Sequence, residues 1–408
     1  MTLEEARAQD TADPLRSARE RFRLPDGVIY LDGNSLGAMP KATSARLAEV
    51  VERQWGEDLI TSWNRHGWID WPTRIAAKLA PIVGARPDDL LIADSTSVCL
   101  FKLLGAALAA RPNRKVILVE EGSFPTDLYV AQGLAGLMPG IEVRAVSTDR
   151  IAPSVDSDTA VLMLTHIDYR SGARHDMAAL NAAAHDAGAL TLWDLSHSAG
   201  AIAVDLGDGG CDLAVGCGYK YLNGGPGAPA FLYVAERLQN ELRSPISGWM
   251  GHADPFAFAG SYEPVAGIRR FLTGTPSILG LAALDCGLDT FADVELSAIE
   301  AKAEALTRTF IEAVEERCGS AVTLASPRDP TARGSHICFA HPNGYAVMQA
   351  LIARGIIGDF RPPDLMRFGF ASLYNSFEDA WLAADNLGSI LETDEWNQPR
   401  FLERQAVT

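Results

Sequence analysis

The stretch AVLMLTHIDYRSGARHDMAALNAAAHDAGALTLWDLS, residues 160–196, shows the pattern that decides the fold. Short apolar runs at 160–166 and 190–196 have strand composition, and the Ala-rich segment 177–188 between them has helical composition. A strand, a helix and a second strand in this order form a crossover between parallel strands. The stretch therefore predicts an α/β fold built on a mostly parallel sheet covered by helices.

The same pattern continues on both sides of this stretch. Further strands are expected at DLLIADS (89–95), KVILVEE (115–121), LAVGCG (213–218) and PAFLYV (229–234), with helices at 97–110 and 124–136. The alternation stops in the turn-rich residues 260–275. After them come a helix-rich stretch at 276–318, short apolar runs at 337–341, 354–360 and 365–370, and a closing helix at 376–392. We expect an N-terminal segment (1–40) that is compatible with either domain, a large domain (41–265) and a smaller α+β domain (266–408).

Composition narrows the class of protein. The chain has 408 residues, of which 48% are hydrophobic, so it can fill at least one large core. Its 52 acidic and 35 basic side chains give a net charge of −17, which repels nucleic acid and anionic lipid, so neither is an expected partner. The six cysteines form no CxxC pair, so no metal site is expected, and reduced thiols fit a cytosolic protein. An acidic N-terminus and the absence of an apolar run of about 20 residues predict a cytoplasmic protein without a membrane span.

The strongest local signal is GYKYLNGGPG, residues 218–227, which places Lys220 after an expected strand and before a glycine-rich turn. A lysine in a glycine-lined cleft can act as a nucleophile towards an aldehyde, so Lys220 is a candidate Schiff-base residue. The alternative is an ordinary solvated lysine before a turn.

A second signal lies 26 residues earlier, where Asp194 ends the expected strand 190–196. Pyridoxal 5'-phosphate (PLP) acts as an electron sink while its ring nitrogen stays protonated, and a buried carboxylate beside that nitrogen keeps the proton there. The alternative for Asp194 is a helix N-cap. His197 is a candidate contact of the cofactor or of a substrate carboxylate, and the alternative is a histidine satisfied within its loop.

A third signal would bind the phosphate. Residues 95–97 (STS) lie between an expected strand and a helix start, where free N–H groups and the helix dipole bind anions, although such residues are also common caps. In SFPTD, residues 123–127, Phe124 offers a ring to stack on a pyridine and Asp127 a further carboxylate. All these residues follow expected strands, and ligands bind at the ends of strands in open α/β sheets. The sequence has no GxGxxG motif after the first strand, which disfavours a dinucleotide as the ligand. Together they predict a PLP site.

The sequence also resembles the kynureninase family, within the fold-type I, class-V-like PLP-dependent enzymes, from about Tyr30 to about Ile390. The matching stretches are YLDGNSLG (30–37), WGEDLITSWNRHGW (55–68), SFPTDLY (123–129), WDLSHSAGAIAVDL (193–206), GCGYKYLNGGPGAPAF (216–231), SGWMGH (247–252), GTPSI (274–278), RGSH (333–336) and MRFGFASLYNSF (366–377). The pair GYKYLNGGPG and SGWMGH separates this family from aminotransferases and desulfurases, which share only the general pattern. The resemblance implies a PLP-dependent transferase-like fold.

The resemblance assigns three kinds of role. Catalysis is implied for Lys220, Tyr219 and Asp194. Cofactor binding is implied for Thr96, Ser97, Phe124, Asp127, Thr165, Asp194, His197, Tyr219 and Lys220, and for Trp249 and Thr275 reaching in from the neighbouring subunit of a homodimer. Substrate binding is implied for Ser35, Trp63 and Arg367, the last at the α-carboxylate, which a planar guanidinium suits. Tyr219 is our candidate proton carrier in addition to its place at the phosphate.

The activity implied is hydrolytic cleavage of L-kynurenine to anthranilate and L-alanine, in tryptophan catabolism and NAD biosynthesis. Trp63 and Thr275 stand where animal members carry histidine and asparagine, so the chain resembles the bacterial branch, which favours L-kynurenine over 3-hydroxykynurenine. Two alternatives remain. A cysteine desulfurase or selenocysteine lyase would need a nucleophilic cysteine, for which Cys338 is the nearest residue. A binding protein on the same fold that has lost catalysis would be expected to lack Lys220, Asp194 or Arg367.

Overall fold

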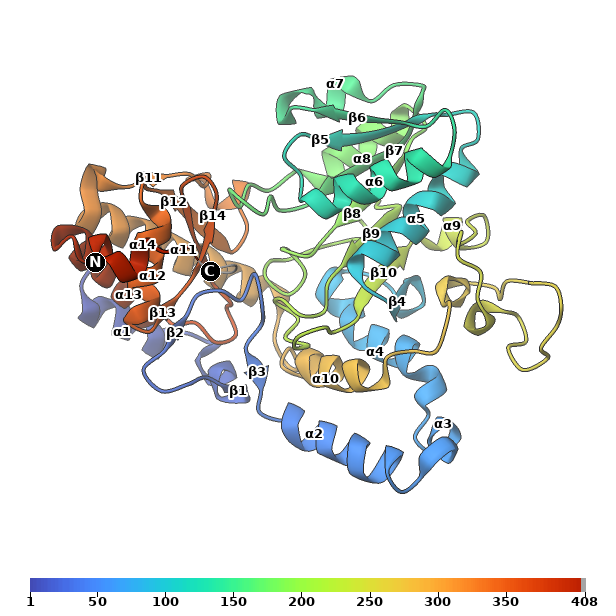
Figure 1. The fold of residues 1–408 in the computed structure, drawn as a ribbon, viewed down its shortest axis with the longest axis horizontal. Helices are drawn as coiled ribbons and strands as arrows, with labels where there is room; N and C mark the ends of the chain where they lie inside the picture. The colour runs from blue at the N-terminus through green and yellow to red at the C-terminus, as the bar shows by residue number, and fades with distance from the viewer. Residues whose placement is uncertain (405–408) are drawn as a thin grey trace.

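The computed structural model describes residues 1–404 and contains a seven-stranded sheet in its large domain (Figure 1). The strands are β4 (Leu90–Ala93), β5 (Val116–Glu120), β6 (Glu142–Val146), β7 (Thr159–Thr165), β8 (Leu190–Asp194), β9 (Leu213–Gly216) and β10 (Ala230–Val234). Their order is β4-β10-β9-β8-β7-β5-β6, parallel from β9 to β6, while β10 runs antiparallel to both of its neighbours. The predicted α/β fold with a mostly parallel sheet is confirmed.

Strand β6 is the one member of this sheet that the sequence pattern did not indicate. It lies at the sheet edge with its residues half-buried or exposed, whereas the other six strands are buried along their whole length. A strand buried on both faces gives a continuous apolar run, but an edge strand such as EVRAV tolerates charged side chains. The pattern of apolar runs therefore did not predict β6.

Helices follow the strands as expected and begin at short capping residues. α5 (Thr96–Ala110) is capped by the Ser95 hydroxyl, which accepts from Val98 N–H, and α8 (Met177–Asp186) is capped by Asp176. α6 (Pro125–Leu137) begins with proline, whose missing N–H costs nothing in the first turn. These strand-to-helix turns bring the first residues of α5 and α6 to the same edge of the sheet as the ends of β7 and β8.

A second hydrophobic core lies under the antiparallel sheet β11 (Thr323–Leu324), β12 (His336–Ala340), β15 (Leu365–Gly369) and β14 (Asp359–Arg361). The helices around it are α1 (Leu3–Ala12), α11 (Leu296–Cys318), α12 (Gly344–Ala353), α13 (Phe377–Glu392) and α14 (Pro399–Leu402). This is the smaller α+β domain that the sequence predicted, and Figure 1 shows it beside the large sheet with the N-terminus on it.

The two cores divide the chain differently from the expected boundaries, which stay a prediction. Ala6 and Leu31 of the N-terminal segment belong to the second core, and β2 (Ile29–Tyr30) pairs with β13 (Ile356–Ile357). Conversely, Leu281 and Leu284 of α10 (Ile278–Asp289) belong to the core of the large domain. Side-chain packing therefore puts the change from one core to the other near α11, later than residue 266.

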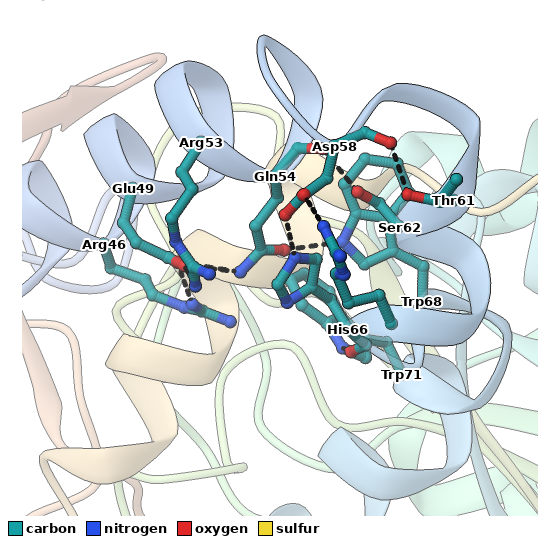
Figure 2. Close-up of polar contacts among 11 residues, drawn as sticks. Arg46, Glu49, Arg53, Gln54, Asp58, Thr61, Ser62, His66, Trp68 and Trp71 are labelled. Atoms are coloured by element: carbon teal, nitrogen blue, oxygen red, sulfur yellow. Dashed lines mark hydrogen bonds and ion pairs between the residues drawn. The ribbon is translucent and has the colours of Figure 1, made fainter.

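After the N-terminal segment the chain forms α2 (Thr43–Glu49), which continues as a π-helical segment, Val50–Trp55, before α3 (Ser62–Arg65) and α4 (Trp71–Leu79). Figure 2 shows the polar network that holds these segments together. Buried Gln54 donates to both Glu49 carboxylate oxygens at 2.8 Å and accepts from Trp68 Nε1 at 2.7 Å, and Trp63 of α3 packs edge-on against Trp68. The network fixes the position of α3 and of Trp63.

None of the helices in residues 1–404 is long and apolar enough to cross a membrane. No three His, Cys, Asp or Glu side chains in the same range are grouped so that they could hold a metal ion.

Candidate active site

A cavity of about 270 Å³ opens at the carboxyl ends of β7 and β8. Ligands bind at this edge in open α/β sheets, so its position is that of an active site. Its walls are Thr96, Ser97, Phe124, Thr126, Asp127, Thr165, Ile167, Tyr169, Asp194, Ser196, His197, Tyr219 and Lys220. Nine of the eleven residues predicted for the cofactor are among these thirteen, so the structure brings those nine together.

Lys220 reaches this cavity from the turn after β9. Its Nζ lies 3.0 Å from His197 Nε2 and 5.9 Å from the ring centroids of Phe124 and Tyr219. The turn is packed closely: Gly37 N–H donates to the Tyr219 carbonyl at 2.8 Å, and a Cβ on Gly37 would lie 2.2 Å from the Lys220 carbonyl oxygen. Gly225 takes a φ of +81°, a conformation that favours glycine. The glycine-rich sequence thus serves to hold the lysine backbone in place.

Two buried carboxyl groups face the lysine from neighbouring elements. Asp194 ends β8, and one of its oxygens accepts the Ser196 N–H at 2.8 Å; no helix starts here, so the N-cap alternative is wrong. Asp127 lies in the first turn of α6, and its Oδ2 has no hydrogen-bond partner. Burial raises the pKa of both carboxyls, and the nearby charge of Asp194 raises the pKa of Asp127 further. A positively charged ligand group between them would stabilise their ionised forms.

His197 is buried at the base of the cavity. Burial, and next the charge of Lys220, lower the pKa of His197 far below its ordinary value, so the imidazole is neutral at physiological pH. Its Nδ1 has no partner, and its ring centroid lies 5.3 Å from that of His336. A neutral histidine in contact with the lysine can exchange hydrogen bonds with it without adding charge.

The opposite end of the cavity is suited to an anion. Thr96 and Ser97 occupy the first two positions of α5, a helix of 15 residues whose first-turn N–H groups point out along the axis. Free N–H groups and the helix dipole at such an end bind phosphate. Ser95 caps the helix, so the adjacent residues Thr96 and Ser97 are left to bind an anion.

Arg367 and Ser35 stand together beside this cavity. Arg367, on β15, donates from Nη1 to the carbonyl of Tyr169 at 2.5 Å and from Nη2 to Ser35 Oγ at 3.1 Å. Tyr169 lines the cavity, with its ring edge-on to Phe124 at 5.3 Å. The small domain therefore brings a buried guanidinium to the wall of a site made by the large domain.

Comparison with known proteins decides the family. A model of the kynureninase C-terminal domain matches residues 299–387. Kynureninase of Pseudomonas fluorescens is 49% identical over 414 aligned residues, which cover 100% of both chains. Kynureninase of Burkholderia mallei (strain SAVP1) is 51% identical with the same coverage. The chain belongs to the kynureninase family.

Solved structures show the same fold beyond this family. A cysteine desulfurase from Thermococcus onnurineus NA1 is 19% identical and superposes with a TM-score of 0.77 over 92% of this chain and 98% of its own. A mutant of C-DES with glycine covalently linked to its PLP cofactor is 17% identical, with a TM-score of 0.78 over 90% and 98%. The predicted PLP-dependent transferase-like fold is confirmed.

The desulfurase alternative is not favoured by the setting of Cys338. This thiol lies on β12, fully buried, with its Sγ 2.5 Å from the carbonyl of Arg170. Burial raises the pKa of Cys338 far above its ordinary value, whereas a nucleophilic cysteine needs exposure and thiolate character. The alternative of a chain without catalytic residues lacks support as well, since Lys220, Asp194 and Arg367 are present and close together.

The donor set fits PLP by an observation independent of the relatives. Asp127 Oδ2, Thr165 Oγ1 and His197 Nδ1 are buried at the cavity and have no hydrogen-bond partner among residues 1–404. Buried polar atoms are normally hydrogen-bonded, so three such atoms around one cavity indicate a polar ligand. The helix end of α5 suits its phosphate, Phe124 its ring, Asp194 its ring nitrogen and Lys220 its aldehyde.

Five predicted residues do not line this cavity in the single chain: Ser35 and Arg367 stand beside it, and the other three are Trp249, Thr275 and Trp63. Trp249, at the start of a 3-10 turn, is 39% exposed and contacts Phe256, and Thr275 is not among the lining residues. Trp63 lies on α3 against Trp68, and it too is absent from the lining. Trp249 and Thr275 were expected from a neighbouring subunit, and for Trp63 the sequence offered no such expectation.

Sequence reasoning missed residues that the structure places at the site. Tyr169 lines the cavity, His336 packs on His197, and Asp359 pairs with Arg367. The available signal was a charged or polar residue within an apolar strand, as in RGIIGDF for Asp359 and RGSHICFAH for His336. Only the fold shows that these strands face the large domain.

Proposed function

We propose that this chain is a PLP-dependent hydrolase that cleaves the Cβ–Cγ bond of L-kynurenine to give anthranilate and L-alanine. Membership of the kynureninase family supports the reaction. The single structural observation that carries this proposal is the cavity beside Arg367. It is lined by Lys220, Asp194 and the buried polar atoms that lack a hydrogen-bond partner among residues 1–404. PLP, when bound, supplies the electron sink that makes the substrate Cα acidic and the Cβ–Cγ bond breakable.

The residues of the chain have separable tasks. Thr96, Ser97 and the end of α5 would hold the phosphate of PLP, and Phe124 would cover its ring. Asp194, from its buried position at the end of β8, would keep the ring nitrogen protonated. Lys220 would hold the aldehyde group, and its Nζ is placed to remove the proton from the substrate Cα. Arg367 and Ser35 orient the α-carboxylate so that this proton faces the lysine.

Tyr219 is suited to the hydrolytic half of the reaction. Water must add to the substrate γ-carbonyl, and the oxyanion that forms needs a donor in a site shielded from solvent. Burial raises the pKa of the Tyr219 phenol above its ordinary value, so the hydroxyl keeps its proton at neutral pH. We infer that Tyr219 donates to this oxyanion in addition to its place at the phosphate.

Replacing Tyr219 by phenylalanine is expected to keep PLP bound while slowing turnover by about a hundredfold, because one oxyanion donor is lost. Stopped-flow absorbance would separate early proton removal, which should stay fast, from release of anthranilate, which should become slow. Equal slowing of both phases, or loss of the cofactor, would assign Tyr219 to the phosphate alone.

The function itself is tested by anthranilate fluorescence from PLP-loaded protein given L-kynurenine and 3-hydroxykynurenine in parallel. Trp63 and Thr275 support a preference for L-kynurenine, as in the bacterial branch. Product release from L-kynurenine with the higher kcat/KM is expected. No aromatic amine from either compound, with PLP bound, would refute the proposed function.

We further propose a homodimer whose active sites are completed across the interface. The large exposed side chains Trp249, Phe256, Phe258 and Tyr262 lie within one segment, and an apolar groove along residues 36–51 and 279–283 offers a surface of matching character. Apolar patches of this kind mark protein interfaces. Trp249 and Thr275 of one protomer would then reach the cavity of its partner.

Mixing two inactive variants tests this arrangement. Lys220→Ala and Trp249→Ala proteins, refolded or co-expressed together, are expected to recover about a quarter of wild-type activity, because about half of all dimers formed are hybrids and each hybrid carries one intact site out of two. Neither variant alone should do so. Absence of recovery in a mixture that sedimentation shows to contain hybrid dimers would place Trp249 in its own subunit's site.

A cytoplasmic enzyme of tryptophan catabolism and NAD biosynthesis is the role we propose for this activity. The six free cysteines support this location, because reducing compartments keep thiols unpaired.

A further inference from the structure

Asp359 makes the most extensive set of ionic contacts near the active site, and the tasks given above do not use it. Its carboxylate accepts from Arg367 Nε at 2.7 Å and from Arg367 Nη2. It also accepts from Arg361 Nη2 at 2.6 Å and from Ser35 Oγ at 3.0 Å. Asp359 is 2% exposed and Arg367 1% exposed, so water does not replace these contacts.

The geometry of the pair divides the guanidinium of Arg367 into two edges. The Nε/Nη2 edge is occupied side-on by Asp359, in the bidentate arrangement that guanidinium and carboxylate groups favour. The Nη1/Nη2 edge has weaker partners, the carbonyl of Tyr169 and the hydroxyl of Ser35. Both of these partners are neutral, and Tyr169 belongs to the cavity wall. The edge that remains for a further carboxylate is thus the one that faces the site.

We propose that Asp359 is the positioning residue of Arg367: it fixes the Nε/Nη2 edge and thereby presents the Nη1/Nη2 edge to the α-carboxylate of the substrate. This inference rests on the proposed function and extends it to a residue that does not touch substrate or cofactor. On binding, the substrate carboxylate takes the places of the Tyr169 carbonyl and the Ser35 hydroxyl, while Asp359 stays.

The neighbouring carboxyl, Asp32, helps to show which carboxyl is the ionised partner of Arg367. Burial, and next the charge of Asp359, raise the pKa of Asp32 to about 7. At Asp359 burial is the largest single cause, but the charges and hydrogen bonds of Arg367, Arg361 and Ser35 together outweigh it and lower the pKa. Asp359 is therefore the ionised partner of Arg367 at neutral pH. Two cations, Arg367 and Arg361, share it, so a third carboxylate from the substrate enters a site that still carries positive charge.

The test compares substrate binding with and without the α-carboxylate. In Asp359→Asn, KM for L-kynurenine is expected to rise about tenfold or more, because the guanidinium loses its fixed edge, while kcat stays within about twofold. The decarboxylated analogue of kynurenine, which keeps the amine and the aromatic ketone, should inhibit the variant and the wild type with the same constant. A general loss of structure would weaken both compounds equally.

Two further variants keep the test decisive. Asp359→Glu retains the charge but moves it by one methylene, and the same selective rise in KM is expected even where Asp359→Asn folds poorly. Arg361→Gln removes the other cation from the same carboxylate and should change KM by less than about twofold, because the edge of Arg367 is untouched. Melting temperature and the PLP absorption spectrum serve as checks on folding.

The outcomes separate this inference from the proposed function. If wild-type protein releases anthranilate but both Asp359 variants keep its KM, or weaken the analogue as much as the substrate, the positioning role is refuted and the function stands. If wild-type protein releases no anthranilate, the proposed function fails first.

Discussion

Replacing Lys220 by alanine is expected to lower kcat for anthranilate release by about a thousandfold or more, because both the attachment point of PLP and the base at Cα are lost. Lys220 is the lysine that lines the cavity, and its amine faces His197 at 3.0 Å. The His197 imidazole, whose pKa burial lowers far below its ordinary value, is a poor substitute base. Fluorescence of anthranilate under saturating L-kynurenine and PLP measures the loss.

A matched control and a rescue experiment make this result specific. Lys115→Ala removes an exposed lysine at the start of β5, away from the cavity, and should leave kcat unchanged. Small alkylamines added to Lys220→Ala should restore part of the activity, since they replace the missing base in the space that the side chain occupied. Turnover that survives the substitution without added amine would show that another group removes the Cα proton.

The sequence carried most of the information for the large domain. Strands buried on both faces appear as continuous apolar runs. Of the chemistry-bearing residues, Asp194 is the last residue of β8 and Lys220 lies in the turn after β9. Chain order alone therefore brought them to one sheet edge. The edge strand β6 had no such run and was not predicted.

The small domain and its contacts were harder to predict, for a physical reason. Arg367 and Asp359 pair across neighbouring antiparallel strands, and both side chains are buried against residues of the N-terminal segment and the large domain. Burial of a charged pair depends on which distant segment covers it, and no local periodicity records that. The same holds for α10, whose Leu281 completes the core of the large domain although it follows the turn-rich boundary.

Substitution of Asp194 distinguishes its role from that of the other buried carboxyl, Asp127. Asp194→Asn is expected to lower kcat about a hundredfold or more, because an amide cannot hold a proton on the ring nitrogen of PLP as a carboxylate does. The amide oxygen can still accept the Ser196 N–H that Asp194 accepts at 2.8 Å, so the local turn should survive. The measurements are kcat for anthranilate release and the absorption spectrum of bound PLP.

Asp127→Asn is the matched comparison, because Asp127 lines the same cavity and is also buried. Burial raises the pKa of both groups, and a positive charge on the ligand favours the ionised form of the carboxyl that lies nearer to it. Asp194 ends β8 beside Lys220, whereas Asp127 stands at the helix start next to the stacking ring of Phe124. We therefore expect Asp127→Asn to weaken PLP binding more than it lowers kcat. A larger fall in kcat for Asp127→Asn than for Asp194→Asn would show that Asp127, not Asp194, is the partner of the ring nitrogen. The cofactor would then lie in a different orientation in the cavity.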